Sequence, residues 1–307
     1  MKRDFISILD WSSEDILNNL KYAIELKQLS KAGKCEKLLS GKNYGLFFHK
    51  PSLRTRLSFE VGINQLGGKT IVLSEQDFTI GKRESVSDIA RVMSRYLDGI
   101  LIRTFSHQMV LDIARHATVP IVNMLTDFNH PCQVMSDLLT IKEKLGFIDD
   151  VRIAYLGDSN NVTNSWLNLA ARIPIDLRIA TAPETLPDMN LVSKIKEIGI
   201  SKIKVTHSAK EAVDGAEVLY TDVWASMGEK DKIVEREKVL KEYQIDSALL
   251  KYAEKNAIVM HCLPAEREKE ITDEVLEGKQ SVVFDQAENR LHAQKAILVQ
   301  LEKWRRV

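Results

Sequence analysis

The sequence is poor in the features that mark secreted, membrane and disulfide-rich proteins. Its three cysteines, Cys35, Cys132 and Cys262, are an odd number without paired spacing, which argues against a disulfide framework or a zinc site. No apolar run approaches the roughly 18 residues of a membrane-spanning helix. The N-terminal stretch also turns polar too early for a signal peptide. We therefore expect a soluble cytoplasmic protein.

Net charge and nucleotide-binding loops are missing as well. Lys plus Arg and Asp plus Glu both number 43, so no overall field attracts nucleic acid or an acidic membrane, and we expect neither as a partner. No G-x-x-x-x-G-K-[ST] sequence occurs, and "GDSNN" at 157–161 lacks the G-x-G-x-x-G fingerprint. A nicotinamide or flavin enzyme is therefore not expected, and any recognition of an anion must be local.

What the chain does have is a regular alternation of short apolar runs with longer amphipathic stretches. Ten runs are candidate strands, at 44–49, 70–73, 99–103, 120–125, 151–156, 177–180, 203–206, 216–221, 257–261 and 281–284. Most are continuously apolar, as expected of parallel strands covered on both faces. Such frequent alternation of strand and helix predicts an α/β protein with parallel sheets.

A length of 307 residues predicts about two domains. A helical segment ends near residue 145 and a new strand follows, so we expect a first domain over 1–145 and a second over 146–284. The stretch 285–307 is expected to be a closing amphipathic helix. Each domain should be a parallel β-sheet flanked by helices, with interdomain helices joining the two. The first helix is predicted to start at Ser12, with Asp15 as its capping partner.

Polar or reactive residues directly follow six of the predicted strands, and in open parallel sheets ligands bind at those carboxyl ends. The segments are "HKPSLRTR", Arg103, "TDFNHPCQ", "GDSNN", "DVWASMG" and "HCLP". Random surface polarity would scatter between both ends of the strands. The pattern therefore favours an active site between two domains.

Each segment also has a plain structural explanation when taken alone. Ser52 is a good N-cap for a helix over 53–66, and that helix start, with Arg54 and Thr55, forms either a phosphate cradle or a capped, solvated helix end. His130 either donates to a carbonyl oxygen or caps a helix. Asp222 either binds an ammonium group or caps a turn.

The same choice applies to the remaining segments. Asn160 and Asn161 hold a small polar ligand by their amides or cap a helix. Cys262 is a thiolate near a substrate amine or a small buried hydrophobe. A purely structural explanation is acceptable for any one segment. It is harder to accept for six segments at the same end of the strands.

Together these stretches resemble the transcarbamylase family, and within it the members that act on ornithine. "FHKPSLRTRLSFE" is similar to the carbamoyl phosphate motif and "FNHPCQ" to the second carbamoyl site. "DVWASMG" and "MHCLP" are similar to the ornithine signatures, and "FDQAENRLHAQKA" to the closing helix, which in the family returns to the first domain. The resemblance covers essentially the whole chain, with the motifs in the same order and spacing.

The resemblance implies two sets of binding residues. Those for carbamoyl phosphate are Ser52, Leu53, Arg54, Thr55, Arg103, His130, Gln133, Cys262, Leu263 and Arg290. Those for ornithine are Asn161, Asp222, Ser226 and Met227. Asp222 and Cys262 would help to deprotonate the substrate amine, while Arg103 and His130 would stabilise charge on the carbonyl oxygen. The products would be citrulline and phosphate, in arginine biosynthesis or breakdown.

The resemblance further implies a homotrimer and a reaction without a cofactor or metal. Leu53 departs from the family pattern, which commonly has Thr there, and Thr79 stands where many relatives have a Gln that reaches a neighbouring subunit; Lys82 or Arg83 are possible substitutes. Sibling enzymes that act on an N-acylated ornithine, putrescine or aspartate remain alternatives. So does a non-catalytic paralogue that binds without turnover.

Overall fold

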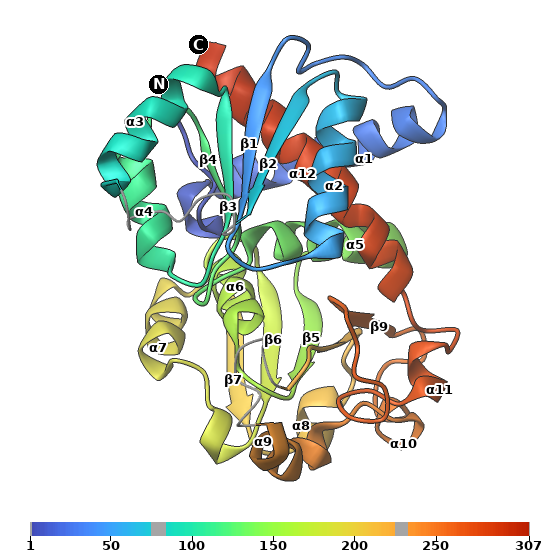
Figure 1. The fold of residues 1–307 in the computed structure, drawn as a ribbon. Coiled ribbons are helices and arrows are strands. Elements are labelled where there is room, and N and C mark those ends of the chain that lie inside the picture. Colours follow the sequence, from blue (N-terminus) through green and yellow to red (C-terminus); the bar gives the residue numbers. More distant parts are fainter. Residues whose placement is uncertain (1, 75–83, 225–232, 307) are drawn as a thin grey trace. The chain divides into compact units, whose positions relative to one another are not determined.

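The computed structural model describes residues 2–74, 84–224 and 233–306, and Figure 1 shows their fold with most helices and strands labelled. The chain divides into two compact units, Met1–Leu139 with Asn289–Val307, and Thr140–Glu288. The chain passes between units inside two helices, α5 (Pro131–Leu145) and α12 (Val283–Arg306). The boundaries predicted at 145 and 285 lie close to the ends of these same helices.

The first unit is built on a four-stranded parallel sheet in the order β2-β1-β3-β4. Its strands are β1 (Asn43–Phe48), β2 (Lys69–Ser74), β3 (Gly99–Arg103) and β4 (Ile121–Leu125), and its helices are η1 (Ile8–Asp10), α1 (Ser13–Lys31), α2 (Leu53–Gln65), α3 (Val86–Tyr96) and α4 (His107–His116). Phe5 pairs with Val122, so the N-terminal segment covers the outer edge of β4.

The second unit is built on a five-stranded parallel sheet in the order β7-β6-β5-β8-β9. Its strands are β5 (Val151–Leu156), β6 (Ile175–Ala180), β7 (Lys202–Thr206), β8 (Val218–Thr221) and β9 (Ile258–His261). Its helices are α6 (Asn161–Ala170), η2 (Pro183–Thr185), α7 (Met189–Ile198), α8 (Ala209–Val213), α9 (Ile233–Leu240), η4 (Lys241–Tyr243), α10 (Ser247–Leu250) and α11 (Asp273–Leu276).

Two parallel sheets flanked by helices confirm the predicted α/β class. All residues of β3, β8 and β9 are buried, which explains why these strands are continuously apolar rather than alternating. Nine of the ten predicted strands form. The tenth, at 281–284, is wrong: Ser281 makes a single bridge to Val259, and the chain then winds into α12 from Val283.

The expected helix starts are also confirmed where capping signals exist. Ser12 caps α1 and exchanges bonds with Asp15 in a capping box. Ser52 caps α2, and its Oγ accepts the backbone N–H of Thr55 at 3.3 Å. Among the described helices, none is long and apolar enough to cross a membrane.

Candidate active site

Each sheet has a point where the order of its strands reverses, and open α/β sheets bind ligands beyond the carboxyl ends of the strands there. In the first unit this point lies between β1 and β3, and in the second between β5 and β8. Several of the sequence-predicted residues follow these strands, including Ser52 after β1 and Asp222 after β8, so each sheet presents its own group of polar side chains.

In the first unit the polar group centres on the hydroxyl of Thr55, which is fully buried in the first turn of α2. Arg103 Nη1 donates to Thr55 Oγ1 at 3.2 Å, and Arg290 Nη2 donates to it at 2.7 Å. Ser52 Oγ lies 3.0 Å from the same oxygen. Four of the predicted carbamoyl phosphate residues therefore meet at one point.

Local features of the backbone orient the side chains of Arg103 and of the first turn of α2. Arg103 is the last residue of β3, and the pairing of β3 with β4 shifts register between Ile102 and Arg103, an irregularity of the kind that redirects a side chain. Arg54 follows Ser52 in the first turn of α2 and is half-buried. Leu53 instead leaves 72% of its surface exposed. Free N–H groups of a helix first turn beside guanidinium groups form a site for an anion.

His130 directly precedes α5 and is buried in the same unit. Burial lowers the pKa of His130 well below its ordinary value of 6.5, and the positive charges of Arg290 and Arg103 lower it further. The imidazole is therefore neutral at neutral pH. Gln133, almost fully buried in the first turn of α5, donates to Asp137 Oδ1 at 2.8 Å.

The loop that carries His130 is held by two buried asparagines that sequence reasoning missed. Asn129 Nδ2 donates to the carbonyl oxygen of Ile6 at 3.2 Å, and Asn123 Nδ2 donates to the same oxygen at 3.1 Å. Asn123 Nδ2 also lies 2.5 Å from Asn129 Oδ1. The only sequence signal was an asparagine next to His130 in "FNHP", which by itself reads as a turn residue.

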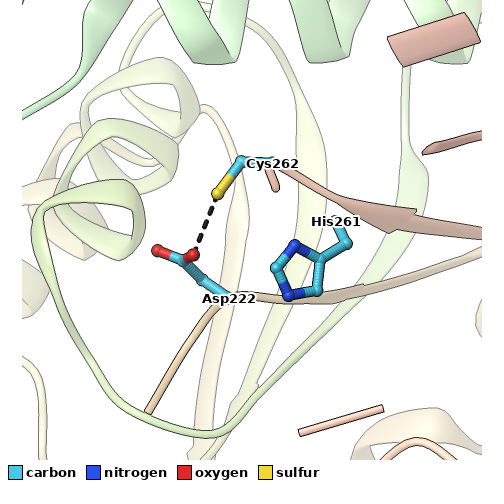
Figure 2. A group of neighbouring side chains, drawn as sticks. All are labelled: Asp222, His261 and Cys262. Carbon is cyan, nitrogen blue, oxygen red and sulfur yellow. Dashed lines mark hydrogen bonds between the residues drawn. The ribbon is translucent and has the colours of Figure 1, made fainter. Parts of the chain in front are cut away.

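In the second unit the polar group centres on the carboxylate of Asp222, directly after β8 (Figure 2). Cys262 Sγ, directly after β9, donates to Asp222 Oδ1 at 2.9 Å, and the N–H of Val223 donates to the same oxygen at 2.8 Å. Asn160 Nδ2 donates to the other oxygen, Oδ2, at 2.8 Å. Asp222 is 8% exposed, so a nearly buried anion receives donors from three strand ends.

The two centres differ in charge in the way that two reactants would require. The first gathers guanidinium groups and a neutral histidine, which suit a phosphate and a polarised carbonyl. The second presents a carboxylate beside a thiol, which suits an amine. The predicted carbamoyl phosphate residues Cys262 and Leu263 belong to the second unit.

Comparison with known proteins matches both units to one family. Residues 3–143 match the carbamoyl-P binding domain of aspartate/ornithine carbamoyltransferase, and residues 149–301 match the Asp/Orn binding domain. The chain belongs to the aspartate/ornithine carbamoyltransferase family.

Within this carbamoyltransferase family, two similar proteins with curated names are ornithine carbamoyltransferases. The chain is 49% identical to the chloroplastic enzyme of Pisum sativum over 97% of this chain and 80% of the relative, and 48% identical to that of Methanoculleus marisnigri over 98% and 97%. The solved ornithine carbamoyltransferase of Pyrococcus furiosus is 43% identical with a TM-score of 0.93, covering 97% of this chain and 96% of its own. An anabolic ornithine carbamoyltransferase from Campylobacter jejuni is 35% identical, also at 0.93, covering 98% and 99%.

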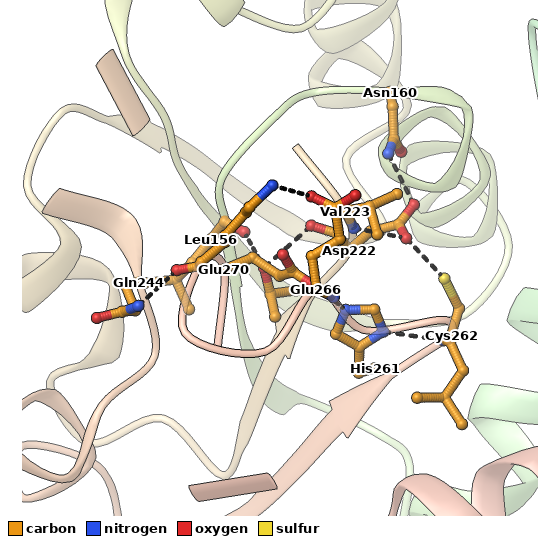
Figure 3. Close-up of polar contacts among 12 residues, drawn as sticks. Leu156, Asn160, Asp222, Val223, Gln244, His261, Cys262, Glu266 and Glu270 are labelled. Atoms are coloured by element: carbon orange, nitrogen blue, oxygen red, sulfur yellow. Dashed lines mark hydrogen bonds and ion pairs between the residues drawn. The ribbon is translucent and has the colours of Figure 1, made fainter. Parts of the chain in front are cut away.

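A second buried pair that sequence reasoning did not predict, His261 and Glu270, supports the turn at Cys262 of this carbamoyltransferase (Figure 3). His261 Nε2 faces Glu270 Oε1 at 2.9 Å, and His261 Nδ1 accepts the N–H of Leu263 at 2.8 Å. Both ionisable side chains are fully buried. Leu263 has a φ of 57°, a strained value for a branched residue, and the bond from its N–H to His261 holds it there.

Asp222, His261 and Cys262 are the one group of metal-ligating side chains close enough to share an ion in the described parts of the chain, with ligand atoms within 4.8 Å of one another. Both ring nitrogens of His261 are already engaged, with Glu270 and with the backbone of Leu263. This histidine would have to give up one of those bonds to coordinate a metal ion.

The other predicted residues lie as follows. Asn161 is the first residue of α6, half-buried, and its carbonyl oxygen accepts the hydroxyl of Ser165 at 2.7 Å. Ser226 and Met227 lie outside the described residues, as do Thr79, Lys82 and Arg83.

Proposed function

We propose that the chain is an ornithine carbamoyltransferase, which transfers the carbamoyl group of carbamoyl phosphate to the side-chain amine of L-ornithine and yields L-citrulline and phosphate. The relatives reported above are named ornithine carbamoyltransferases. The observation that carries the proposal is the presence in one chain of a guanidinium-rich centre at Thr55 and an anionic centre at Asp222.

In the proposed reaction the first centre holds carbamoyl phosphate. Arg54 and the free N–H groups at the start of α2 bind the phosphate, and Arg103 bridges the phosphate and the carbonyl oxygen. Neutral His130 donates a hydrogen bond to that oxygen. As the amine attacks, negative charge builds on the carbonyl oxygen, and these donors stabilise it before the bond from carbon to the phosphate oxygen breaks.

The second centre binds and prepares the amine. The free pKa of an alkyl amine is about 10, so ornithine arrives as an ammonium ion and must lose a proton to attack. The carboxylate of Asp222 attracts the ammonium group, and Asp222 with Cys262 orients it and assists its deprotonation. A new carbon–nitrogen bond then forms, and phosphate leaves with the electron pair of the broken bond.

A parallel ureido-product assay tests this proposal. Purified protein receives carbamoyl phosphate with ornithine, N-acetylornithine, N-succinylornithine, putrescine or aspartate, and product is measured colorimetrically. We expect strong product with ornithine alone. Product with another amine instead would move the assignment to a sibling enzyme, and no product with any of them would favour the non-catalytic paralogue.

We also propose a homotrimer that works in the cytoplasm. Apolar side chains of the first unit that leave two-fifths or more of their surface exposed include Leu57, Val61, Ile71, Val92 and Tyr96. The last three line an apolar cavity of about 280 Å³ together with residues of β1 and α3. A mass in solution of three times 34.8 kDa by light scattering would support the trimer, and the mass of a single chain would exclude it.

A further inference from the structure

Asn160 makes more contacts than a helix cap requires. It lies between β5 and α6, where its side-chain oxygen accepts the N–H of Val162 at 2.8 Å and the N–H of Thr163, and its own backbone N–H donates to the hydroxyl oxygen of Thr163 at 3.3 Å. The hydroxyl of Tyr155 lies 3.3 Å from the same oxygen as a further donor. Three donors therefore fix which way the amide faces.

The opposite end of the same amide faces the anionic centre. With the oxygen of Asn160 turned to the helix, its Nδ2 points at Asp222 Oδ2 and donates to it at 2.8 Å (Figure 3). Asp222 Oδ1 is left for the N–H of Val223 and for Cys262 Sγ. The rotamer of Asp222 is thus set from both of its oxygens.

Tyr155 is suited to act as a permanent donor in this arrangement. Its ring is fully buried in β5 and stacks on Tyr220, with 5.5 Å between ring centroids and 15° between planes. Burial raises the pKa of Tyr155 well above its ordinary value of 10, and the nearby charge of Asp222 adds to the effect. Its hydroxyl therefore stays protonated at neutral pH.

We propose that Asn160, oriented by Tyr155, is a positioning residue that holds the Asp222 carboxylate in line with Cys262 for the substrate amine. This inference rests on the proposed function and adds residues that act through Asp222. A plain helix cap explains only the bonds to the oxygen of Asn160. Asp, Ser and Thr cap helices as well, but an ionised Asp has no donor, and the single short hydroxyl of Ser or Thr that caps the helix does not extend to Asp222. The amide of Asn160 carries its acceptor and its donor on separate atoms, so it caps the helix with one and reaches Asp222 with the other.

A substitution that keeps the helix cap but removes the donor to Asp222 separates the capping role of Asn160 from its positioning role. Asn160→Ser keeps a good N-cap and removes the bond to Asp222. We expect kcat/KM for ornithine to fall about 100-fold, as a misplacement of about 1 Å near the reacting atoms does, with KM for carbamoyl phosphate and the melting temperature unchanged. Tyr155→Phe should lower kcat/KM for ornithine about 10-fold, because the amide keeps its two helix donors.

A matched control exists in the same unit. Asp188 caps α7, a helix of 10 residues like α6, through the N–H groups of Asn190 and Leu191. Asp188→Ser makes the same kind of cap exchange without a bond to Asp222, and should leave kcat/KM unchanged. If Asn160→Ser loses no more activity than Asp188→Ser, the positioning role is wrong. The same holds if its loss of activity is matched by a loss of melting temperature.

A second readout does not depend on turnover. The thiolate is the species that iodoacetamide alkylates, and a carboxylate held beside Cys262 opposes its formation. Freeing Asp222 in Asn160→Ser should therefore speed alkylation of Cys262 about threefold to tenfold, measured on its peptide by mass spectrometry. Cys35, half-buried in the other unit, is the internal reference, while burial raises the pKa of Cys132 to about 12 and keeps it unreactive.

The two readouts distinguish failure of this inference from failure of the proposed function. A wild-type protein that makes no product with ornithine overturns the proposed function, and alkylation then decides the role of Asn160 alone. An unchanged alkylation rate of Cys262 in Asn160→Ser overturns the positioning role whatever the activity.

Discussion

The two polar centres of the molecule are built on the same plan with opposite charge. Each lies where the strand order of a parallel sheet reverses, and each gathers side chains from neighbouring strand ends around one oxygen-bearing side chain. Around Thr55 the converging groups are guanidinium donors. Around Asp222 the acceptor itself carries the charge, and the converging groups are an amide, a backbone N–H and a thiol.

In the proposed reaction, this difference in charge lets one architecture bind two different reactants. Burial lowers the pKa of His130, and the same arginines that favour an anion, Arg290 and Arg103, lower it further and keep the imidazole a neutral donor. A buried carboxylate favours a cation, so it needs neutral donors to hold it without cancelling its charge. Each centre should therefore respond to substitution through one substrate and leave the other nearly untouched.

The largest effect is expected at the guanidinium-rich centre around Thr55, called the cationic centre from here on. In the proposed reaction, Arg54→Ala removes a positive charge that would bind the phosphate and stabilise it as it leaves, so kcat should fall about 1,000-fold. Arg56→Ala is the matched control, because Arg56 lies on the same helix but is exposed and pairs with Glu60 at 3.0 Å. Steady-state ureido assays of both variants check this. Near-normal turnover in Arg54→Ala would remove the phosphate from this site.

A slightly smaller effect, on the other substrate, is expected at the anionic centre. Asp222→Asn keeps the size of the side chain and removes its charge, so kcat/KM for ornithine should fall about 100-fold to 1,000-fold while KM for carbamoyl phosphate changes little. Glu254→Gln is the control, an exposed carboxylate paired with Arg152 in the same unit. A parallel rise in both KM values would show that the two centres are not separable.

Thr55→Val tests whether the hydroxyl organises the arginines. The exchange keeps the shape and leaves Arg103 and Arg290 without the oxygen to which both donate. We expect kcat/KM for carbamoyl phosphate to fall about 10-fold to 100-fold, as for the loss of hydrogen bonds to charged groups. Ser58→Ala, on the next turn of α2, should change it little. Equal effects of the two exchanges would argue against a special role for Thr55.

His130 makes the cationic centre sensitive to acid. Below pH 6.5 the unfolded chain binds a proton at this histidine while the folded protein does not, because burial, Arg290 and Arg103 lower its folded pKa. The free energy of unfolding should therefore decrease as the pH falls from 6.5 and level off below the folded pKa.

Urea unfolding between about pH 8 and about pH 5 measures this decrease. His130→Asn should flatten the slope below pH 6.5. A steeper slope in His130→Asn would reverse the sign of the argument. His107, whose pKa burial also lowers, contributes a residual slope in every variant.

The cationic centre was the easier of the two to predict from the sequence, because much of it is contiguous. Ser52, Arg54 and Thr55 occupy one helix start with a recognisable cap, so their proximity follows from local rules. Arg290 is 235 residues from Thr55, and no local pattern relates them. Only the family resemblance pointed to it.

Local sequence patterns predicted less of the anionic centre and of the segment at 281–284 in the second unit. Asn160 was predicted to be either a ligand or a cap. It is a cap, and its bond to Asp222, 62 residues away, depends on sheet order that no spacing reveals. The strand predicted at 281–284 failed for a related reason. A short apolar run fits a strand or a helix start equally well, and tertiary pairing allowed it one bridge before α12 began.

The smallest expected effect concerns Leu53, which stands beside the caps and donors of the cationic centre without contributing a polar group. Its side chain is 72% exposed, so a threonine fits there without displacing a neighbour. Leu53→Thr should tighten carbamoyl phosphate binding about threefold to tenfold, since one added hydrogen bond is worth about 1 kcal/mol. Leu57→Thr, one turn along and 50% exposed, is the control. An unchanged or weaker apparent affinity in Leu53→Thr would mean that this cradle holds phosphate through the backbone and arginines alone, and differs in construction from that of relatives with a threonine there.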